Sequence, residues 1–424
     1  MGESRHVCDL LVVGAGPAGL AAAYRASKNG LRVTVVDDNP AAGGQIWRGE
    51  HSKPKSAEAQ VWFEKLRSVQ IEFVNGARVF QGAGKTLAAE TPRGVVEFAF
   101  ENVVLATGAR ERFLPFPGWT LPNVMGAGGL QALVKTGLPI EGERVVVAGS
   151  GPLLLAVAGY LSEQGAEVLL IAEQAPALRL ARFGLGILNS GKVSQAWTLK
   201  KSFSRKGAKE QKAAKYLSGC WVTEARGVGK LESVTLVRRG KRWEVACEYL
   251  ACGFHLVPNV ELAELLGCAV EEGSVRVDEF QQTTVPSVYS AGETTGIGGL
   301  ELSLVEGEIA GLAASGAHDA ARGLFAVRDR QRKFSELLNR TFALRDELKS
   351  LAALETIVCR CEDVTLERLR AHDSWRAAKL QTRCGMGSCQ GRVCGGAVEF
   401  LFGWRAESVR PPVLPVRVES LTAD

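Results

Sequence analysis

Residues 8–19 read CDLLVVGAGPAG, and this stretch decides the fold class of the 424-residue chain. Its apolar first half is typical of a buried strand, and three glycines in the pattern Gly-x-Gly-x-x-Gly follow directly. An Ala- and Leu-rich stretch then predicts a helix that ends near Gly30, and the β-branched residues 33–36 predict a second strand. The order strand, glycine turn, helix, strand predicts a dinucleotide-binding unit of an α/β fold.

The glycines of this unit have separate physical tasks. Gly14 permits the tight turn, Gly16 lets the backbone approach a pyrophosphate, and Gly19 lets the helix pack on the strand. The helix N-terminus offers N–H groups and a partial positive charge to an anion. Asp37 lies 23 residues after Gly14 and is expected to accept hydrogen bonds from ribose hydroxyls, with the adjacent Asp38 as the alternative.

The same pattern recurs about 135 residues later in a degenerate form. Residues 144–148 predict a strand that runs into Gly149 and Gly151, but Leu154 stands where the third glycine belongs. Glu173 lies one residue beyond the spacing expected for the ribose acid. We therefore expect a second nucleotide-binding domain whose occupant stays open: NAD(P), FMN, ATP or another adenine nucleotide, or no ligand.

Composition and charge exclude several classes of protein. The chain is 46% hydrophobic and 23% charged, so it can bury a large core, and a net charge of +5 is too small for a nucleic-acid binder. No signal peptide or transmembrane segment is expected, and we predict a cytoplasmic protein. Residues 200–215 hold seven Lys or Arg and one Glu, which favours a solvated face over a docking surface for an acidic partner.

The ten cysteines are distributed unevenly. Four lie singly at Cys220, Cys247, Cys252 and Cys268, and we interpret them as small buried residues. Five lie between residues 359 and 394, a clustering that predicts a soft-metal site in a reducing compartment. Helices are predicted at 365–372, with Thr365 as N-cap, and at 395–402. An iron–sulfur cluster, a structural zinc and a vestigial site without metal are the alternatives.

Three further segments carry a family resemblance over roughly residues 8–320. They are Gly43-Gly44-Gln45, a strand that ends in Ala106-Thr107-Gly108, and a strand that ends in Ala291-Gly292-Glu293. With these, the chain resembles the two-dinucleotide-binding-domain flavoproteins, which are glutathione-reductase-like and thioredoxin-reductase-like. The resemblance implies FAD at the first site, with Glu293 where the family usually has Asp. The implied FAD-binding residues are Gly14, Gly16, Pro17, Ala18, Gly19, Asp37, Asp38, Gly44, Gln45, Arg48, Val79, Thr107, Gly108, Gly292 and Glu293.

Other features of that family are missing. Disulfide reductases of the family need a Cys pair against the flavin, yet no Cys occurs between Cys8 and Cys220. None of the five His residues lies in a motif for proton abstraction. Arg48, Arg110 and Arg112 are the basic residues near the flavin motifs, and FAD phosphate or a subunit interface is a better expectation for them than a substrate carboxylate. We expect no substrate acid–base pair in this chain.

Residues 356–404 resemble the bacterioferritin-associated-ferredoxin-like 2Fe–2S module. The resemblance rests on Cys359-Arg-Cys361 and on the run from Thr382 to Cys394, in which Met386 replaces the first Cys of the usual second pair. It implies Cys359, Cys361, Cys389 and Cys394 as ligands, with Cys384 as the alternate.

These motifs predict a division into five parts. The expected order is a discontinuous FAD domain at 1–115 and 255–330, a second nucleotide domain at 116–254, a helical linker at 331–355, the cysteine module at 356–404 and an extended tail at 405–424. Helices are expected around 301–316 and 328–350.

The combination closely resembles the α subunits of heteromeric dye-linked dehydrogenases, which include opine oxidases, proline and hydroxyproline dehydrogenases and hydrogen cyanide synthases. The resemblance implies an oxidoreductase subunit for electron transfer, together with a catalytic, amino-acid-oxidase-like FAD β subunit and, as a further candidate partner, a small ferredoxin-like protein. It leaves open opine, proline, hydroxyproline or glycine as the substrate, and attachment to the inner face of the membrane through partners. The alternatives are a self-contained NAD(P)H-dependent reductase and a purely structural subunit.

Overall fold

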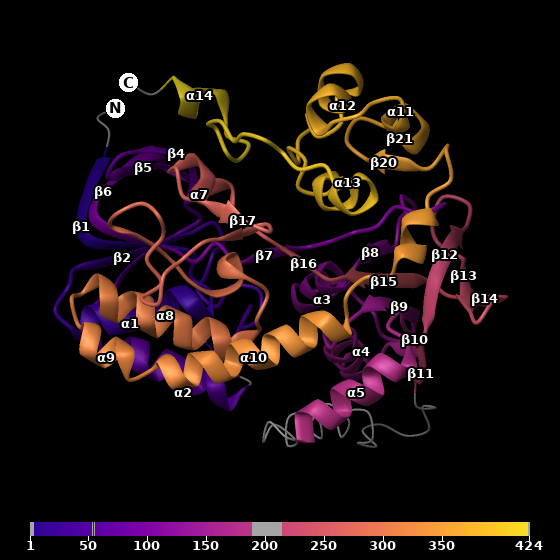
Figure 1. Cartoon of the computed structure of the whole chain (residues 1–424), viewed down its shortest axis with the longest axis horizontal. Coiled ribbons are helices and arrows are strands. Elements are labelled where there is room, and N and C mark those ends of the chain that lie inside the picture. The colour runs from indigo at the N-terminus through magenta and orange to yellow at the C-terminus, as the bar shows by residue number, and fades with distance from the viewer. Residues whose placement is uncertain (1–3, 53, 55, 189–213, 423–424) are drawn as a thin grey trace. The chain divides into compact units, whose positions relative to one another are not determined.

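The computed structural model describes residues 4–52, 54, 56–188 and 214–422 (Figure 1). Its contacts divide the chain into two compact units. Unit 1 comprises Met1–Arg110, Val257–Glu336 and Ser408–Asp424, and unit 2 comprises Glu111–Leu256 and Leu337–Glu407. Residues 200–213 of the basic stretch 200–215 lie outside the described residues.

Unit 1 is built on a seven-stranded mixed sheet. Its path is β3-β2-β1-β6-β5-β4, and β19 adds to β6. The strands are β1 (Ser4–Val13), β2 (Val33–Asp37), β3 (Glu72–Asn75), β4 (Arg78–Ala83), β5 (Thr86–Thr91), β6 (Gly94–Leu105) and β19 (Val288–Ser290). Every residue of β2 is buried, as expected for a parallel strand covered on both faces.

The helices at residues 17–28, 57–67 and 300–314 pack on one face of this sheet, in a core that includes Leu10 and Val12. The helical segments of this part of the chain are α1 (Pro17–Lys28), α2 (Ala57–Arg67), α7 (Glu261–Leu265), η1 (Gly292–Thr295), α8 (Leu300–Ala314), α9 (His318–Arg322) and α10 (Phe325–Thr341). α1 and α8 lie side by side (Figure 1). A Cβ on Gly311 of α8 would lie 2.2 Å from the carbonyl oxygen of Ala22 in α1, so only glycine allows this approach.

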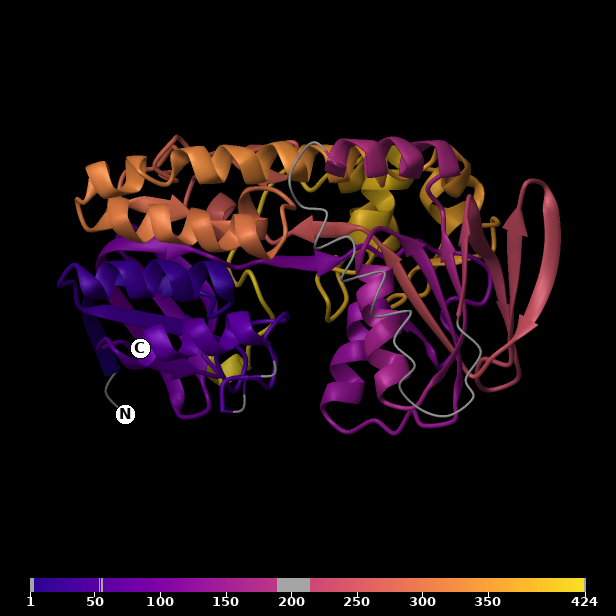
Figure 2. The same ribbon diagram turned by 90° about the horizontal axis from the view of Figure 1, so that it is seen from below.

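Unit 2 contains the second glycine repeat on a five-stranded parallel sheet of order β11-β10-β9-β15-β8. The strands are β8 (Val124–Gly126), β9 (Arg144–Ser150), β10 (Glu167–Glu173), β11 (Lys215–Ser218) and β15 (Tyr249–Phe254), and the helices are α3 (Ala127–Lys135), α4 (Leu153–Glu163) and α5 (Ala177–Leu188). An antiparallel meander, drawn as pink strands in Figure 2, comprises β12 (Cys220–Arg226), β13 (Ser233–Arg238) and β14 (Lys241–Ala246). Short strands outside the main sheets are β7 (Ala109–Glu111), β16 (Leu256–Pro258), β17 (Val270–Glu271) and β18 (Ser274–Val275).

The cysteine module belongs to unit 2 and has its own small core. It contains β20 (Ile357–Cys359), β21 (Val364–Thr365), α11 (Leu366–Arg370), α12 (Trp375–Thr382) and α13 (Cys394–Phe402). Thr365 caps α11 as predicted, because its side chain accepts a hydrogen bond from the Arg368 N–H. Helix α12 was not predicted from the sequence.

Two sequence predictions about structure have clear outcomes here. The single cysteines Cys220, Cys247, Cys252 and Cys268 are all buried, as predicted. The predicted C-terminal end of the helix at 328–350 is wrong. Helix α10 ends at Thr341, and a separate short 3-10 helix, η2 (Asp346–Ser350), follows.

The C-terminal tail is held against unit 1. The Val413 N–H donates to the Phe80 carbonyl at 2.8 Å, and both Arg417 and Ser420, at the start of α14 (Val418–Leu421), donate to Glu90. None of the helices in the described part of the chain has the length and hydrophobicity that a bilayer crossing requires.

Candidate cofactor sites

Four segments that lie far apart in the sequence meet around the first glycine turn. The Gly43 N–H donates to the Ala15 carbonyl at 2.8 Å, and the Ala106 N–H donates to the Val13 carbonyl at 2.8 Å. A Cβ on Gly292 would lie 2.7 Å from the Cβ of Ala18. The glycine turn, the Gly-Gly-Gln segment, the Ala-Thr-Gly strand end and the Ala-Gly-Glu strand end therefore form one locus.

The glycines at this locus differ in what surrounds them. A Cβ on Gly14, whose φ is +107°, would lie 2.2 Å from the Ala106 carbonyl oxygen, so this position is fixed by the fold itself. A Cβ on Gly16 would meet only the Cα of Gly44, at 4.0 Å. The open space at Gly16 is a cradle at a helix N-terminus that could receive a phosphate group.

The two candidate ribose acids have different surroundings. Asp37 ends β2, is buried, and accepts a hydrogen bond from the Ala15 N–H at 2.5 Å. Its other oxygen accepts from the Asn39 N–H at 2.7 Å. The side chain of Asp38 is exposed. Asp37 thus joins the glycine turn, whereas Asp38 does not.

Arg48 offers an unused donor at the same locus. One terminal nitrogen of its guanidinium donates to Asn39 and to Gln45, both at 3.0 Å. Its Nε is buried without a hydrogen-bond partner among the described residues. A buried cationic donor without a partner is costly, and an anionic ligand would satisfy it.

Asn259 fixes the Ala-Thr-Gly strand end, a role that the sequence reading missed. Its side-chain amide donates to the Thr107 carbonyl at 2.9 Å, and its own carbonyl accepts from the Thr107 hydroxyl at 2.7 Å. Arg110 donates to the Asn259 side chain and pairs with Glu261, each at 2.8 Å. One terminal nitrogen of Arg110 is therefore used in structure, while its Nε, like that of Arg48, is buried without a hydrogen-bond partner among the described residues. Arg112 pairs with Glu399 at 3.5 Å.

Glu293 binds the two residues that lead into α8. Its carboxylate accepts hydrogen bonds from the N–H groups of Gly298, at 3.2 Å, and Gly299, at 2.8 Å, directly before α8. Burial raises the pKa of Glu293 to about 7, although these hydrogen bonds oppose the shift. The remaining predicted residue, Val79, is buried in β4 and pairs with Ala89 of β5.

At the second glycine turn, in unit 2, the candidate ribose acid Glu173 is buried and bonded to the backbone. Glu173 ends β10, as Asp37 ends β2, and its carboxylate accepts hydrogen bonds from the N–H groups of Gly151 and Ala175, both at 2.8 Å. Burial raises the pKa of Glu173 to about 7. Leu154 is fully buried in the position of the missing third glycine.

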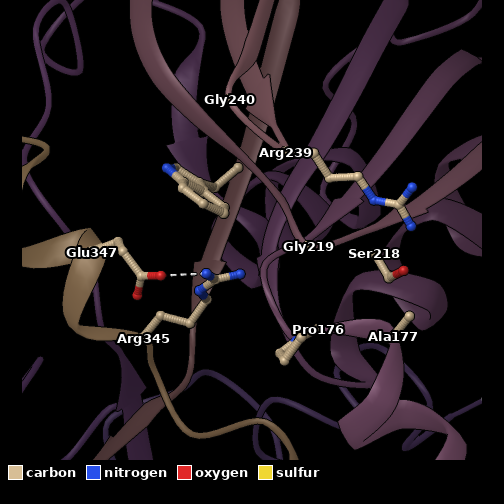
Figure 3. A pocket seen from close by; sticks show the side chains of 9 residues that line it. Pro176, Ala177, Ser218, Gly219, Arg239, Gly240, Arg345 and Glu347 are labelled. Atoms are coloured by element: carbon tan, nitrogen blue, oxygen red, sulfur yellow. Dashed lines mark hydrogen bonds and ion pairs between the residues drawn. The ribbon is translucent and has the colours of Figure 1, made fainter.

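A cavity of about 480 Å³ lies beside the end of β10 (Figure 3). Arg345 pairs with Glu347 at its rim, as the dashed line in Figure 3 marks. The Arg345 guanidinium also lies 4.7 Å from the centre of the Trp221 ring. The lining residues are Pro176, Ala177, Ser218, Gly219, Trp221, Arg239, Gly240, Arg345 and Glu347.

Three cysteines meet in the core of the cysteine module. The sulfur atoms of Cys359, Cys384 and Cys394 lie within 4.8 Å of one another, and all three residues are buried. Cys359 ends β20 and Cys394 begins α13, so secondary structure fixes two of the three. Hydrogen bonds from Cys384 and Cys394 lower the pKa of Cys359, which favours a thiolate at this position.

The other two cysteines form a pair nearer the surface. Cys361 is exposed and Cys389 is partly buried. The Ser388 hydroxyl donates to the Cys361 sulfur at 3.9 Å, and Cys361 also interacts with Cys389. Of the four ligands predicted from the sequence, Cys359 and Cys394 lie in the buried trio with Cys384, the predicted alternate, and Cys361 and Cys389 lie in the outer pair. Thiolates are soft donors that suit iron–sulfur clusters and zinc.

Comparisons with known proteins agree with this architecture. The pyridine nucleotide-disulphide oxidoreductase family matches residues 8–186 and 198–312. The chain is 31% identical to the HcnB subunit of hydrogen cyanide synthase from Pseudomonas aeruginosa, over 91% of this chain and 90% of that protein. It is 30% identical to an opine oxidase subunit from Agrobacterium tumefaciens, over 97% and 91% respectively.

Solved structures share the fold. L-proline dehydrogenase from P. horikoshii superposes with a TM-score of 0.68 at 19% identity, covering 100% of this chain and 81% of that chain. Thioredoxin reductase from T. acidophilum has a TM-score of 0.56 at 20% identity, covering 73% and 98%. The α/β architecture with two Rossmann-like repeats, predicted from the glycine motifs, is confirmed. The chain is an oxidoreductase and belongs to the pyridine nucleotide-disulphide oxidoreductase family.

Proposed function

We propose that this chain is the FAD- and iron–sulfur-containing electron-transfer subunit of a heteromeric dehydrogenase. The complex would oxidise a CH–NH bond in an amino acid, an opine or a related secondary amine. A partner flavoprotein β subunit would carry out that oxidation, and this chain would relay the electrons to an acceptor. The observation that carries the proposal is the coexistence of one well-formed dinucleotide locus with a five-cysteine module in a single chain.

The first locus fits FAD in several respects. Gly16 leaves space at the N-terminus of α1, Arg48 has a buried donor without a partner among the described residues, and Asp37 is fixed at the end of β2. We assign the pyrophosphate to the α1 N-terminus and Arg48, and the ribose to Asp37. The membership in the oxidoreductase family supports the same cofactor.

The residues around the locus suit electron transfer better than substrate chemistry. FAD accepts two electrons and can release them singly, whereas an iron–sulfur cluster carries one electron at a time. Arg110 and Arg112 are held in ion pairs with Glu261 and Glu399, which favours a structural role for them over the anchoring of a substrate carboxylate. Since no cysteine occurs between Cys8 and Cys220, the chain has no thiol pair beside the first glycine turn for disulfide exchange.

We propose that the cysteine module binds a 2Fe–2S cluster through Cys359, Cys361, Cys389 and Cys394. The gathering of all five cysteines in one module supports a thiolate site, and the buried trio makes Cys384 a strong alternate ligand. Anaerobic purification should give iron and acid-labile sulfide near two per chain. The variants Cys394→Ser and Cys384→Ser separate the two ligand sets.

Cys268→Ser is the matched control for these variants, because Cys268 lies in unit 1 and its sulfur donates to the Thr283 hydroxyl, an interaction that serine can keep. Loss of iron in Cys394→Ser but not in Cys268→Ser supports the proposed ligands. Retention of iron in Cys394→Ser with loss in Cys384→Ser would replace Cys394 by Cys384. Zinc in place of iron would refute the cluster.

The names of the relatives support a partnered role. The hydrogen cyanide synthase and opine oxidase relatives are both named as subunits, and this chain covers about nine tenths of each. We propose that the partner is a catalytic FAD-containing β subunit, with a small ferredoxin-like protein as a further candidate. We place the complex in the cytoplasm, with any attachment to the membrane made through the partners.

The second candidate function is a self-contained NAD(P)H-dependent reductase. It would require NAD(P) at Gly149 and Gly151, where the Gly151 N–H is already bonded to Glu173. Anaerobic addition of NADH or NADPH to the isolated chain separates the two functions. Stoichiometric bleaching of the flavin band near 450 nm would favour the second candidate and count against the first.

A further inference from the structure

The second glycine turn binds a segment of the same chain, residues 342–343. Phe342 and Ala343 follow directly after α10, and both are in unit 2 with the turn. The Ser150 hydroxyl donates to the Phe342 carbonyl at 2.7 Å. The Gln174 side-chain amide donates to Ser150 at 2.8 Å, and it reaches the carbonyls of Phe342 and Ala343 at 3.4 and 3.3 Å.

These contacts are buried. Ser150, Gln174 and Phe342 are 5%, 0% and 5% exposed. A hydrogen bond between fully desolvated partners is costly to break without replacement, because each partner would then be left unsatisfied. The contact between the turn and the segment is therefore part of the buried interior of unit 2.

The Phe342 side chain packs beside the second glycine turn. Its ring carbon Cγ lies 4.0 Å from the position a Cβ on Gly151 would take, and the ring packs edge-on against Phe183 at 5.5 Å between centroids. At Gly16, the equivalent glycine of the first repeat, the neighbour at the same distance of 4.0 Å is the Cα of Gly44. The two glycines therefore differ in the kind of neighbour that they face, which is a phenyl ring at the second turn and backbone at the first.

A backbone N–H that could donate to a phosphate at this turn already has a hydrogen-bond partner. The Gly151 N–H at the start of the α4 turn is bonded to the carboxylate of Glu173, which is 1% exposed. An incoming phosphate would have to displace the buried Glu173 carboxyl group from this N–H. The turn is therefore bonded to Glu173 from within the repeat and contacted by the Phe342 segment as well.

The segment continues along the edge where dinucleotides bind in such sheets, the carboxyl ends of the parallel strands. Arg179 of α5 donates to the Ala343 carbonyl at 3.1 Å. Arg345 then stacks on Trp221, and Arg345 and Glu347 line the cavity of Figure 3 together with Pro176 and Ala177, which follow β10.

The chain then enters the cysteine module, which is held to the same unit. The Trp119 indole N–H donates to the Ile357 carbonyl in β20 at 2.6 Å. We propose that the second glycine turn binds the Phe342–Arg345 segment in place of a dinucleotide, and that this contact anchors the cysteine module to the second repeat. The inference concerns unit 2 alone and does not depend on the cofactor at the first site.

Hydrogen exchange of the FAD-loaded full chain tests this proposal. The Phe342 N–H donates to the Leu338 carbonyl at 3.0 Å and should be protected from exchange. Ser150→Ala removes the hydrogen bond that holds the Phe342 carbonyl, so it should speed exchange of this N–H about fivefold to tenfold, the usual effect of one lost hydrogen bond. Ser162→Ala, on α4 of the same repeat, is the matched control and should leave this exchange unchanged. Phe342→Ala should speed exchange at position 342 by removing the ring from Gly151.

Titration with NADH and with ADP-ribose completes the test. The wild-type chain should bind neither with saturation up to millimolar concentration, and neither should slow exchange at residues 149–153. Saturable binding of ADP-ribose that protects residues 149–153 would overturn the proposal, as would an exchange rate at Phe342 that is the same in both variants as in the wild type. Flavin content, measured on the same sample, reports separately on the function proposed above.

Discussion

Gly16→Ala should separate flavin binding from folding at the first glycine turn. The residue precedes α1 with φ −77° and ψ 179°, a conformation that alanine adopts without strain. The added Cβ would lie 4.0 Å from the Cα of Gly44, an ordinary van der Waals contact. The protein itself therefore has room for the methyl group, and any cost must fall on a ligand that occupies this space.

The substitution should have opposite effects on the flavin-free and the flavin-bound protein. Without flavin, the variant should be unchanged or more stable by about 0.4–1 kcal/mol, because alanine restricts the unfolded chain. With flavin, the methyl group meets the pyrophosphate, and overpacking of this kind costs about 1–3 kcal/mol. That penalty corresponds to FAD binding weakened about 5- to 150-fold.

The assay is a titration of the flavin-free chain with FAD, followed by quenching of flavin fluorescence, together with thermal unfolding of the flavin-free form. Gly159→Ala is the matched control, since it lies in α4 of the second repeat with nothing within 4 Å of its added Cβ. It should leave FAD affinity unchanged. FAD affinity equal to wild type in Gly16→Ala would refute the placement of the pyrophosphate, and loss of the flavin-free fold would refute the steric argument.

Two other perturbations test the packing of unit 1. Gly311→Ala puts a Cβ 2.2 Å from the Ala22 carbonyl oxygen, so it should lower the free energy of unfolding by about 1–3 kcal/mol in a urea titration, and an unchanged midpoint would contradict the close approach of α1 and α8. Burial raises the pKa of Glu90, but hydrogen bonds from Ser420 and Arg417 outweigh it and hold that pKa at about 2. A lowered folded-state pKa stabilises the fold above the unfolded value near 4.5, and this stabilisation is lost as the pH falls toward 2. The difference in Tm between wild type and Glu90→Gln should therefore shrink from pH 6 to pH 3, and a difference that does not depend on pH would contradict the assigned hydrogen bonds.

Local patterns in the sequence were sufficient for the two glycine repeats. A buried strand, a glycine turn and a helix are encoded within about twenty consecutive residues, so β1 and α1, and β9 and α4, could be predicted with their order. Burial of the single cysteines could also be predicted, because an isolated Cys behaves as a small hydrophobic residue.

Long-range hydrogen bonds explain what the sequence could not predict. Asn259 fixes Thr107 across 152 positions in the chain, and no local motif marks it. The end of α10 at Thr341 is another case, because Ser150 and Gln174 bind the carbonyl of Phe342 and divert the chain from the helix that its periodicity favours.

The cysteine module shows the same limit. Spacing identified the module but could not rank five thiols, since the turn between Thr382 and Cys394 decides which sulfur atoms face inward. That turn includes Arg383 in a left-handed conformation, with φ 66°, which directs Cys384 toward Cys359 and Cys394.

Anaerobic absorbance spectroscopy of the flavin band near 450 nm tests the proposed electron-transfer role most directly. A tag on this chain would be used to purify its native complex, and proline, hydroxyproline, glycine and an opine would be added in turn. We predict that one of these substrates bleaches the flavin of this chain in addition to the flavin of the partner subunit, so that the loss of absorbance exceeds one flavin per complex, and that NADH does not bleach the isolated chain. Amino-acid-dependent bleaching of the isolated chain, or its stoichiometric reduction by NADH, would contradict the proposal.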